Sequence, residues 1–221
     1  DMLGESGKTG ELSAQPHRAA PFILVTSHTV QFNPLSDHWL DIRGIEQQLS
    51  AVRQHPHRQL ETCAPCAHRL IEAAQLYRAD FMTGMSLRGC QAYEEWALVW
   101  RERLHRQMCE LLADLTRYYE GRGERRAALE PAERWAHMDP FSEPAQRSLM
   151  RLLALDGQRT QALARYTGFR LRLIQELSVE PEQATQRLYQ HILTEETAQS
   201  SLPGMAGKLP VPLTPFVGRV D

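Results

Sequence analysis

A pair of closely spaced cysteines is the first feature of this 221-residue chain that could do chemistry. Cys63-Ala-Pro-Cys66 has the two-residue gap that zinc sites and thiol redox pairs share. A redox pair needs its first cysteine at the amino end of a helix that follows a strand, and no strand pattern precedes Cys63. A structural zinc site needs four ligands, so His68 and either Cys90 or Cys109 would have to complete the set. We therefore expect packing cysteines, with a metal site and a redox pair as the lesser alternatives.

Other patterns that could support catalysis or cofactor binding are incomplete. Gly7-Lys8-Thr9 resembles the end of a phosphate-binding loop, but Met2 stands where that loop requires glycine. The nine histidines include no His-x-x-x-His pair, and the doublet His55-Pro56-His57 lies in an expected loop. No Ser, His and Asp residues have the setting of a nucleophile elbow. We expect no catalytic residue, no cofactor and no metal, and therefore not an enzyme.

Composition narrows the class of protein further. The formal charge of −2 and the pI of about 6.5 argue against a freestanding DNA-binding protein. Seven arginines between residues 101 and 126 alternate with acidic residues, which is typical of a solvated helix face rather than a basic surface for DNA or polymerase. No signal peptide and no apolar run of about 18 residues is present, so we expect a cytoplasmic protein without a membrane partner.

The distribution of apolar residues predicts helices along most of the chain. Residues 1–20 lack periodicity and are expected to be loop or disordered. Two short β-prone runs, 22–25 and 30–34, flank a polar turn that includes Ser27, His28 and Thr29, which favours a β-hairpin. From Trp39 onward the period is helical: a second expected helix spans 60–79, and the longest stripe spans about 91–121. The predicted fold class is all-α with a small N-terminal β-hairpin.

A repeat of 34 residues relates Gly123 to Gly157, Leu115 to Leu149 and Ala128 to Ala162. This spacing is the tetratricopeptide period, in which each unit is a helix, a turn and a second helix. Small residues at the two alanine positions would let the helices of a unit approach closely, and Ser142 is the expected N-cap of the second unit. Aromatic residues are expected to fill the space between units: Tyr119, Trp135, Tyr166 and Phe169. The same register also arises by chance between antiparallel helix hairpins.

Several stretches resemble a known family. In order, they are 73–81 (AAQLYRADF), 93–96 (YEEW), 101–104 (RERL), 139–143 (DPFSE), 149–155 (LMRLLAL) and 176–181 (ELSVEP). Together they make residues from about 37 to 193 similar to the bacterial transcriptional activator domain of regulators like the antibiotic-regulatory-protein activators. The chain departs from the pattern at Ser178, where glycine is expected. It also departs at Ser27, where a basic residue is frequent.

The resemblance implies a domain order. Residues 21–36 would be the wing of a winged-helix DNA-binding domain, whose recognition helix would precede residue 1. In that reading Ser27, His28 and Thr29 could contact DNA. Residues 37–196 would be the helical activator domain. Residues 197–221 would be a linker toward a downstream ATPase-like domain, because 213–219 (LTPFVGR) is similar to its entry.

The resemblance also implies function through protein contact. The expected partners are a second copy of the chain, RNA polymerase and the downstream sensor or ATPase domain, with DNA bound only through the full-length protein. Tyr93, Trp96 and Trp100 are expected to pack the long helix against the hairpin, and Trp96→Ala to cost about 3–5 kcal/mol as a core truncation. The alternative is a generic tetratricopeptide adaptor unrelated to transcription, which would lack the hairpin.

Overall fold

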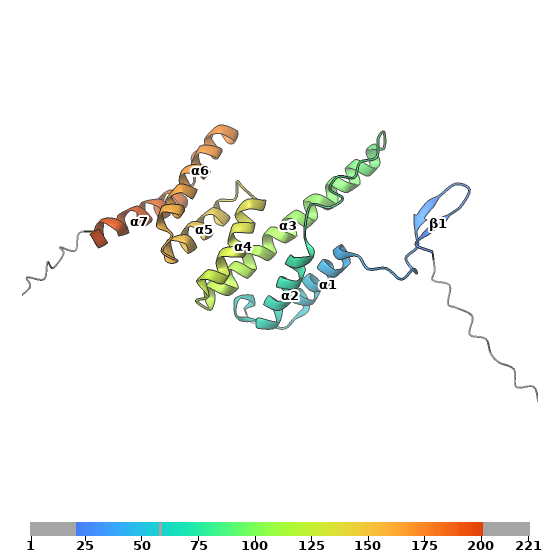
Figure 1. The fold of residues 1–221 in the computed structure, drawn as a ribbon, viewed down its shortest axis with the longest axis horizontal. Coiled ribbons are helices and arrows are strands. Elements are labelled where there is room, and N and C mark those ends of the chain that lie inside the picture. The colour runs from blue at the N-terminus through green and yellow to red at the C-terminus, as the bar shows by residue number, and fades with distance from the viewer. Residues whose placement is uncertain (1–20, 58, 201–221) are drawn as a thin grey trace, which may run out of the picture.

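The computed structural model describes residues 21–57 and 59–200, with a β-hairpin followed by helices (Figure 1). The predictions for residues 1–20 and for the stretch after 200 lie outside these residues. The strands are β1 (Ile23–Val25) and β2 (Val30–Phe32). The helices are α1 (Asp41–Gln54), the 3-10 helix η1 (Leu60–Thr62), α2 (Ala64–Leu76), α3 (Gln91–Gly121), α4 (Arg125–Met138), α5 (Glu143–Leu155), α6 (Arg159–Leu177) and α7 (Gln183–Ser200). The predicted all-α class with a small hairpin is confirmed.

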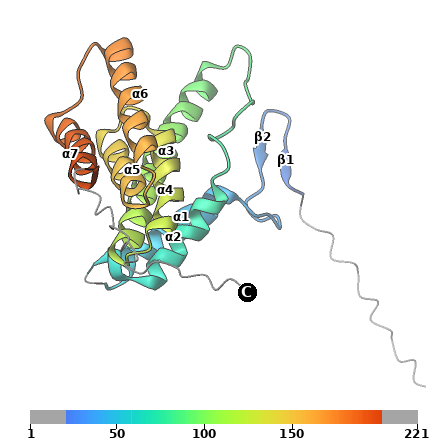
Figure 2. The same ribbon diagram turned by 60° about the vertical axis from the view of Figure 1, so that its left-hand side comes forward.

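The hairpin pairs its strands in antiparallel fashion, with Ile23 opposite Phe32 and Val25 opposite Val30. Its turn is closed by the Thr26 hydroxyl, which accepts hydrogen bonds from the backbone N–H of Thr29 at 2.9 Å and of His28 at 3.3 Å. Figures 1 and 2 show the hairpin standing apart from the helices. A two-stranded hairpin is marginally stable in water, so its exposed apolar side chains suit a further packing partner.

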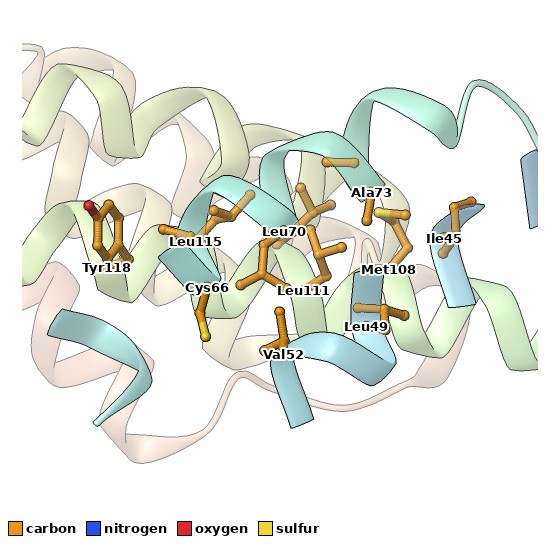
Figure 3. Packing of buried hydrophobic residues seen from close by; sticks show 13 residues of the cluster. Ile45, Leu49, Val52, Cys66, Leu70, Ala73, Met108, Leu111, Leu115 and Tyr118 are labelled. Atoms are coloured by element: carbon orange, nitrogen blue, oxygen red, sulfur yellow. The ribbon is translucent and has the colours of Figure 1, made fainter. Parts of the chain in front are cut away.

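The helices form antiparallel pairs, α1 with α2, α3 with α4 and α5 with α6, and each pair packs on the next. One core cluster joins α1, α2 and α3 around the buried residues Leu70, Leu111 and Leu112 (Figure 3). A second cluster joins α4 to α7 around Leu149 and Met150. Tyr119 and Trp135 pack against both clusters, as expected of aromatic residues between units. A single stacked core therefore runs along the helical part.

The turns of the two repeat units have the same backbone geometry. Gly123 and Gly157 both adopt the left-handed conformation, with φ of 73° and 81°. The next residue after each glycine donates its N–H back into the preceding helix, from Glu124 to the Tyr119 carbonyl at 2.9 Å and from Gln158 to the Leu153 carbonyl at 2.8 Å. These are paired helix C-terminal motifs at an interval of 34 residues, and they explain why both turns carry glycine.

The expected N-cap of α5 is confirmed, because the Ser142 hydroxyl accepts a hydrogen bond from the Ala145 N–H at 3.4 Å. The helix then begins with Glu143 and Pro144, which suit a first helical turn. At the other end of this unit, Ser178 closes α6 in the left-handed region with φ of 57°. Its N–H donates to the Ile174 carbonyl at 3.1 Å, so a Cβ-bearing residue stands in a conformation that favours glycine.

Ser178→Gly is expected to raise the free energy of unfolding by about 0.5–1 kcal/mol. The glycine removes the steric penalty of the left-handed conformation, which outweighs the added freedom of the unfolded chain. Urea unfolding followed by circular dichroism measures the change, with Ser178→Ala as the control because alanine keeps the Cβ atom. Equal stability of the glycine and alanine variants would show that this backbone carries no such penalty.

Candidate interaction surface

The amino-terminal part of α3 extends beyond the neighbouring helices, with the 77–90 connection beside it (Figures 1 and 2). Phe81 of that connection packs edge-on against Trp96, with ring centroids 5.1 Å apart, and lies 5.9 Å from Trp100. Tyr93 completes the group at 5.8 Å from Trp96. The Arg101 Nε–H donates to the Phe81 carbonyl at 2.8 Å and fixes the connection to the helix. This aromatic group therefore supports the extended end of α3.

The expected packing of these aromatic residues against the hairpin is not what the structure has. Phe81 occupies their inner side, while Phe32 of the hairpin packs on His38 at 4.6 Å. Trp96 is 46% exposed and is therefore not a core residue. The three-and-four spacing of Tyr93, Trp96 and Trp100 gives the face that they share, but it cannot say which segment covers that face.

Trp96→Ala is accordingly expected to cost about 1–2 kcal/mol of unfolding free energy, less than a full core truncation. Only the half of the indole that faces Phe81 and Tyr93 loses contacts. Equilibrium unfolding in urea tests this value. A loss above about 3 kcal/mol would show that Trp96 is buried in solution, whereas no loss would show that Phe81 does not pack on it.

Apolar side chains continue along the outer side of this helix. We define the α3 apolar strip as Trp96, Leu98 and Val99, which are 46%, 55% and 67% exposed. Met85 and Leu87 of the adjoining connection are also about half exposed. Ala97, in contrast, is fully buried and holds the helix against the body. Clustered exposed apolar residues of this kind mark protein interaction sites more often than isolated ones do.

The sequence interpretation missed Leu98 and Val99, although a signal for them exists. Ala97-Leu98-Val99-Trp100 is a run of four consecutive apolar residues. Since one buried stripe of a helix accommodates only residues three and four apart, such a run must expose some of its members. The run therefore indicates a helix with apolar residues on more than one side.

The other predicted interaction residues lie inside the scaffold. Ala128 and Ala162 are fully buried, and Tyr166 is 8% exposed and stacks on Tyr189 with ring centroids 4.1 Å apart. Tyr119 and Trp135 sit between the two core clusters. These residues hold the units together, so a partner contact would use exposed side chains instead, such as those of the α3 apolar strip.

The hairpin turn places Ser27, His28 and Thr29 at an exposed tip. Thr29 is engaged with Thr26 through both its backbone and its hydroxyl, which lies 2.8 Å from the Thr26 hydroxyl. Neither Ser27 nor Thr29 carries a positive charge that would attract phosphate. A DNA contact at this tip would therefore depend chiefly on His28.

Two thiols of the helical part, those of Cys66 and Cys109, are poor nucleophiles. Burial, together with the neighbouring Cys63, raises the pKa of the Cys66 thiol to about 11. Burial and the charges of Asp139 and Glu110 raise the pKa of Cys109 to about 11. Reactive cysteines have lowered pKa values, and the segment directly before α2 is the 3-10 helix η1 rather than a strand. The geometry thus does not support a redox pair.

A groove of about 650 Å³ runs along α3 beside the α4–α5 turn. Its lining mixes the basic residues Arg106 and Arg117 with the acidic residues Glu110, Asp114 and Asp139. Burial raises the pKa of the Asp114 carboxyl, while its ion pair with Arg117 acts in the opposite direction. Mixed charges on an open surface do not favour one class of small ligand. Among the described helices, none is long and apolar enough to cross a bilayer.

Comparison with known proteins yields a family match. The family model described as bacterial transcriptional activator domain matches residues 40–193, which includes α1 to α6 and the first part of α7. This match covers more than half of the chain. No curated protein matches this chain.

Proposed function

Because the chain belongs to the bacterial transcriptional activator domain family, we propose that it works by protein contact, as a self-associating part of a transcriptional regulator. The single observation that carries the proposal is the exposure of Leu98 and Val99 beside Trp96 on the extended end of α3. An apolar strip of this kind gains free energy when a partner covers it, at roughly 25 cal/mol per Å² of apolar surface.

A second copy of the chain is the partner that this surface suits best. Two-fold contacts use the same patch on both subunits, so one strip on each copy is enough to form the interface. The strip lies on a helix that extends beyond the scaffold (Figures 1 and 2), where a second helix can pack beside it. RNA polymerase and a downstream sensor or ATPase domain remain the further partners that the family implies.

DNA recognition belongs to the full-length protein in this proposal. The base-reading element of a winged-helix domain is a helix in the major groove. The hairpin before α1 would pack its exposed Ile23 and Val30 faces against such a domain. Regulators of this kind act at promoters, which supports a location in the bacterial cytoplasm.

The generic tetratricopeptide adaptor is the weaker alternative. That alternative lacks the hairpin, whereas β1 and β2 form one here. The family match also includes α1, which lies outside the 34-residue repeat. A plain repeat protein does not require such an additional helix. Both observations support a role in transcription.

Sedimentation velocity over a range of protein concentrations tests the proposed self-association. The unmodified chain is expected to shift from monomer to dimer as its concentration rises. The double variant Leu98→Glu, Val99→Glu is expected to stay monomeric, because it places a charge at two of the three positions of the strip. Leu171→Glu is the matched control, since Leu171 is a leucine of similar exposure (54%) on α6.

Three results would overturn the proposal. The first is an unmodified chain that stays monomeric at every concentration. The second is a double variant that dimerises as well as the unmodified chain. The third is a loss of dimerisation in Leu171→Glu alone, which would move the interface to α6.

A further inference from the structure

The connection between α1 and α2 brings four potential metal ligands to one point. The Nδ1 atom of His55 lies 3.5 Å from the Cys63 sulfur and 3.4 Å from the Cys66 sulfur. The Nδ1 atom of His57 lies 3.5 Å from the Cys66 sulfur and 3.4 Å from the His55 Nδ1. All four atoms lie within 4.8 Å of one another. We call these residues the thiol–imidazole cluster.

The spacing of these atoms matches the edges of a zinc tetrahedron. With Zn–S near 2.3 Å and Zn–N near 2.0–2.1 Å, tetrahedral angles place two nitrogens roughly 3.4 Å apart and a nitrogen and a sulfur roughly 3.6 Å apart. The observed nitrogen–nitrogen distance is 3.4 Å, and the nitrogen–sulfur distances are 3.4 to 3.5 Å. Four of the six edges of the tetrahedron therefore have lengths close to those of a zinc site, and all four ligand atoms lie within 4.8 Å of one another.

Hydrogen bonding alone does not account for this arrangement. The Nδ1 atom of a neutral imidazole has either one hydrogen or one lone pair, so it serves one good partner in the ring plane. The His55 Nδ1, however, faces Cys63, Cys66 and His57 together. A cation at the shared point satisfies all four atoms at once, and two thiolates would neutralise the charge of Zn²⁺ at the edge of an apolar core.

We propose that this chain binds one zinc ion through the Nδ1 atoms of His55 and His57 and the sulfurs of Cys63 and Cys66. The soft thiolates and the imidazoles form a Cys₂His₂ set, which favours zinc over oxygen-preferring cations such as Mg²⁺ or Ca²⁺. Because four protein ligands fill the tetrahedron, the site is structural and leaves no position for a substrate.

The ligand set differs from the one that the sequence alternative named. His68 pairs with Glu72 at 3.4 Å on the exposed side of α2. Cys90 is exposed just before α3, and Cys109 lies next to His105 at 3.7 Å in the groove. The missing ligands come instead from the His55-Pro56-His57 doublet, which the turn after α1 carries back to the start of α2.

The location gives the proposed ion a structural role. His55 is the residue that caps the end of α1, and Cys63 caps the start of α2 without a side-chain hydrogen bond. Cys66 is fully buried and lies at the same end of the core cluster as Val52 (Figure 3). A metal ion here would fix the angle between α1 and α2, as well as the position of η1 against α3.

Metal analysis of the purified chain tests the proposal. Protein prepared in zinc-supplemented medium is expected to contain one zinc ion per chain by elemental mass spectrometry. Metal-free chain kept reduced and titrated with Co²⁺ is expected to give the intense visible bands of a tetrahedral site and a thiolate-to-cobalt band, both saturating at one equivalent. Removal of the metal by a chelator is expected to lower the melting temperature.

Single-residue variants assign the ligands. His55→Asn and Cys66→Ser are each expected to lower zinc affinity at least about 100-fold, because even changes beyond the ligands cost roughly 10–100-fold. His68→Asn and Cys90→Ser are the matched controls and are expected to retain one zinc. Since Cys66 is in the core, the surface residue His55 provides the variant that should fold normally, as circular dichroism checks.

Two results would overturn the proposal. One is unmodified, reduced chain that holds no zinc and gives no tetrahedral cobalt bands. The other is zinc binding that survives in His55→Asn but is lost in His68→Asn or Cys90→Ser, which would assign the metal to other residues.

Discussion

Leu112→Ala is expected to lower the free energy of unfolding by about 3–4 kcal/mol, among the largest effects of any single substitution in the chain. Leu112 is fully buried in the cluster that joins α1, α2 and α3. Truncation removes three carbon atoms from a site whose neighbours belong to three helices, so the cavity that remains can close only in part. Urea unfolding followed by circular dichroism measures the loss.

Leu98→Ala is the matched control, because it makes the same truncation on the same helix at a side chain that is 55% exposed. Its expected loss of stability is below about 1 kcal/mol. The proposed function also predicts that this variant weakens self-association, which Leu112→Ala should affect only through folding. Equal losses of stability in both variants would contradict the assignment of one side of α3 to the core and the other to a partner.

Ala162→Leu is expected to lower the free energy of unfolding by about 2–3 kcal/mol. Ala162 is fully buried where α6 packs on α5, at the position that the repeat reserves for a small residue. Three extra carbon atoms would force the two helices apart or push the leucine into a poor rotamer. Thermal and urea unfolding measure the effect.

Ala164→Leu provides the control for this second variant, since Ala164 is exposed on the same helix. It changes helix propensity and size in the same way, but at an exposed position. Its expected effect is within about 0.5 kcal/mol. If Ala162→Leu were equally well tolerated, close packing within the unit would not depend on a small residue there.

The features that could be predicted from sequence are those set by local patterns. The period of apolar residues predicts the long helix α3 within a residue of its observed bounds. Glycines at an interval of 34 residues predict the two equivalent turns, because only a left-handed residue closes a helix in this way. Ser142 as an N-cap and Ser178 as a strained C-cap follow from the same local rules.

The bounds of the second expected helix could not be predicted from its local apolar pattern. Its stripe runs from Leu60 to Ala79, but the structure has η1, then a break at Cys63, then α2 ending at Leu76. Tyr77 is extended and its hydroxyl donates to Asp80 at 2.9 Å, which begins the connection to α3. The helix thus ends at Leu76, where this side-chain contact begins a turn, although the apolar pattern continues to Ala79.

Features that depend on distant segments could not be predicted. Phe81 packs on Trp96. The spacing of Trp96 from the other apolar residues of α3 does not indicate that Phe81 is its partner. The thiol–imidazole cluster requires the chain to turn after Gln54 so that His55 meets Cys66, 11 residues later. The spacing of Cys63 and Cys66 favours packing cysteines, with a metal site as a lesser alternative, and only the path of the connection brings the two histidines to them.

DNA binding at low and moderate salt tests the central claim most directly, with this chain compared with the full-length gene product from its genomic context. We expect the full-length protein to prefer its own promoter over random sequence, whereas this chain should bind neither sequence appreciably at moderate salt. Preference of this chain alone for one promoter would contradict the account, because base recognition would then come from the hairpin or the helices themselves.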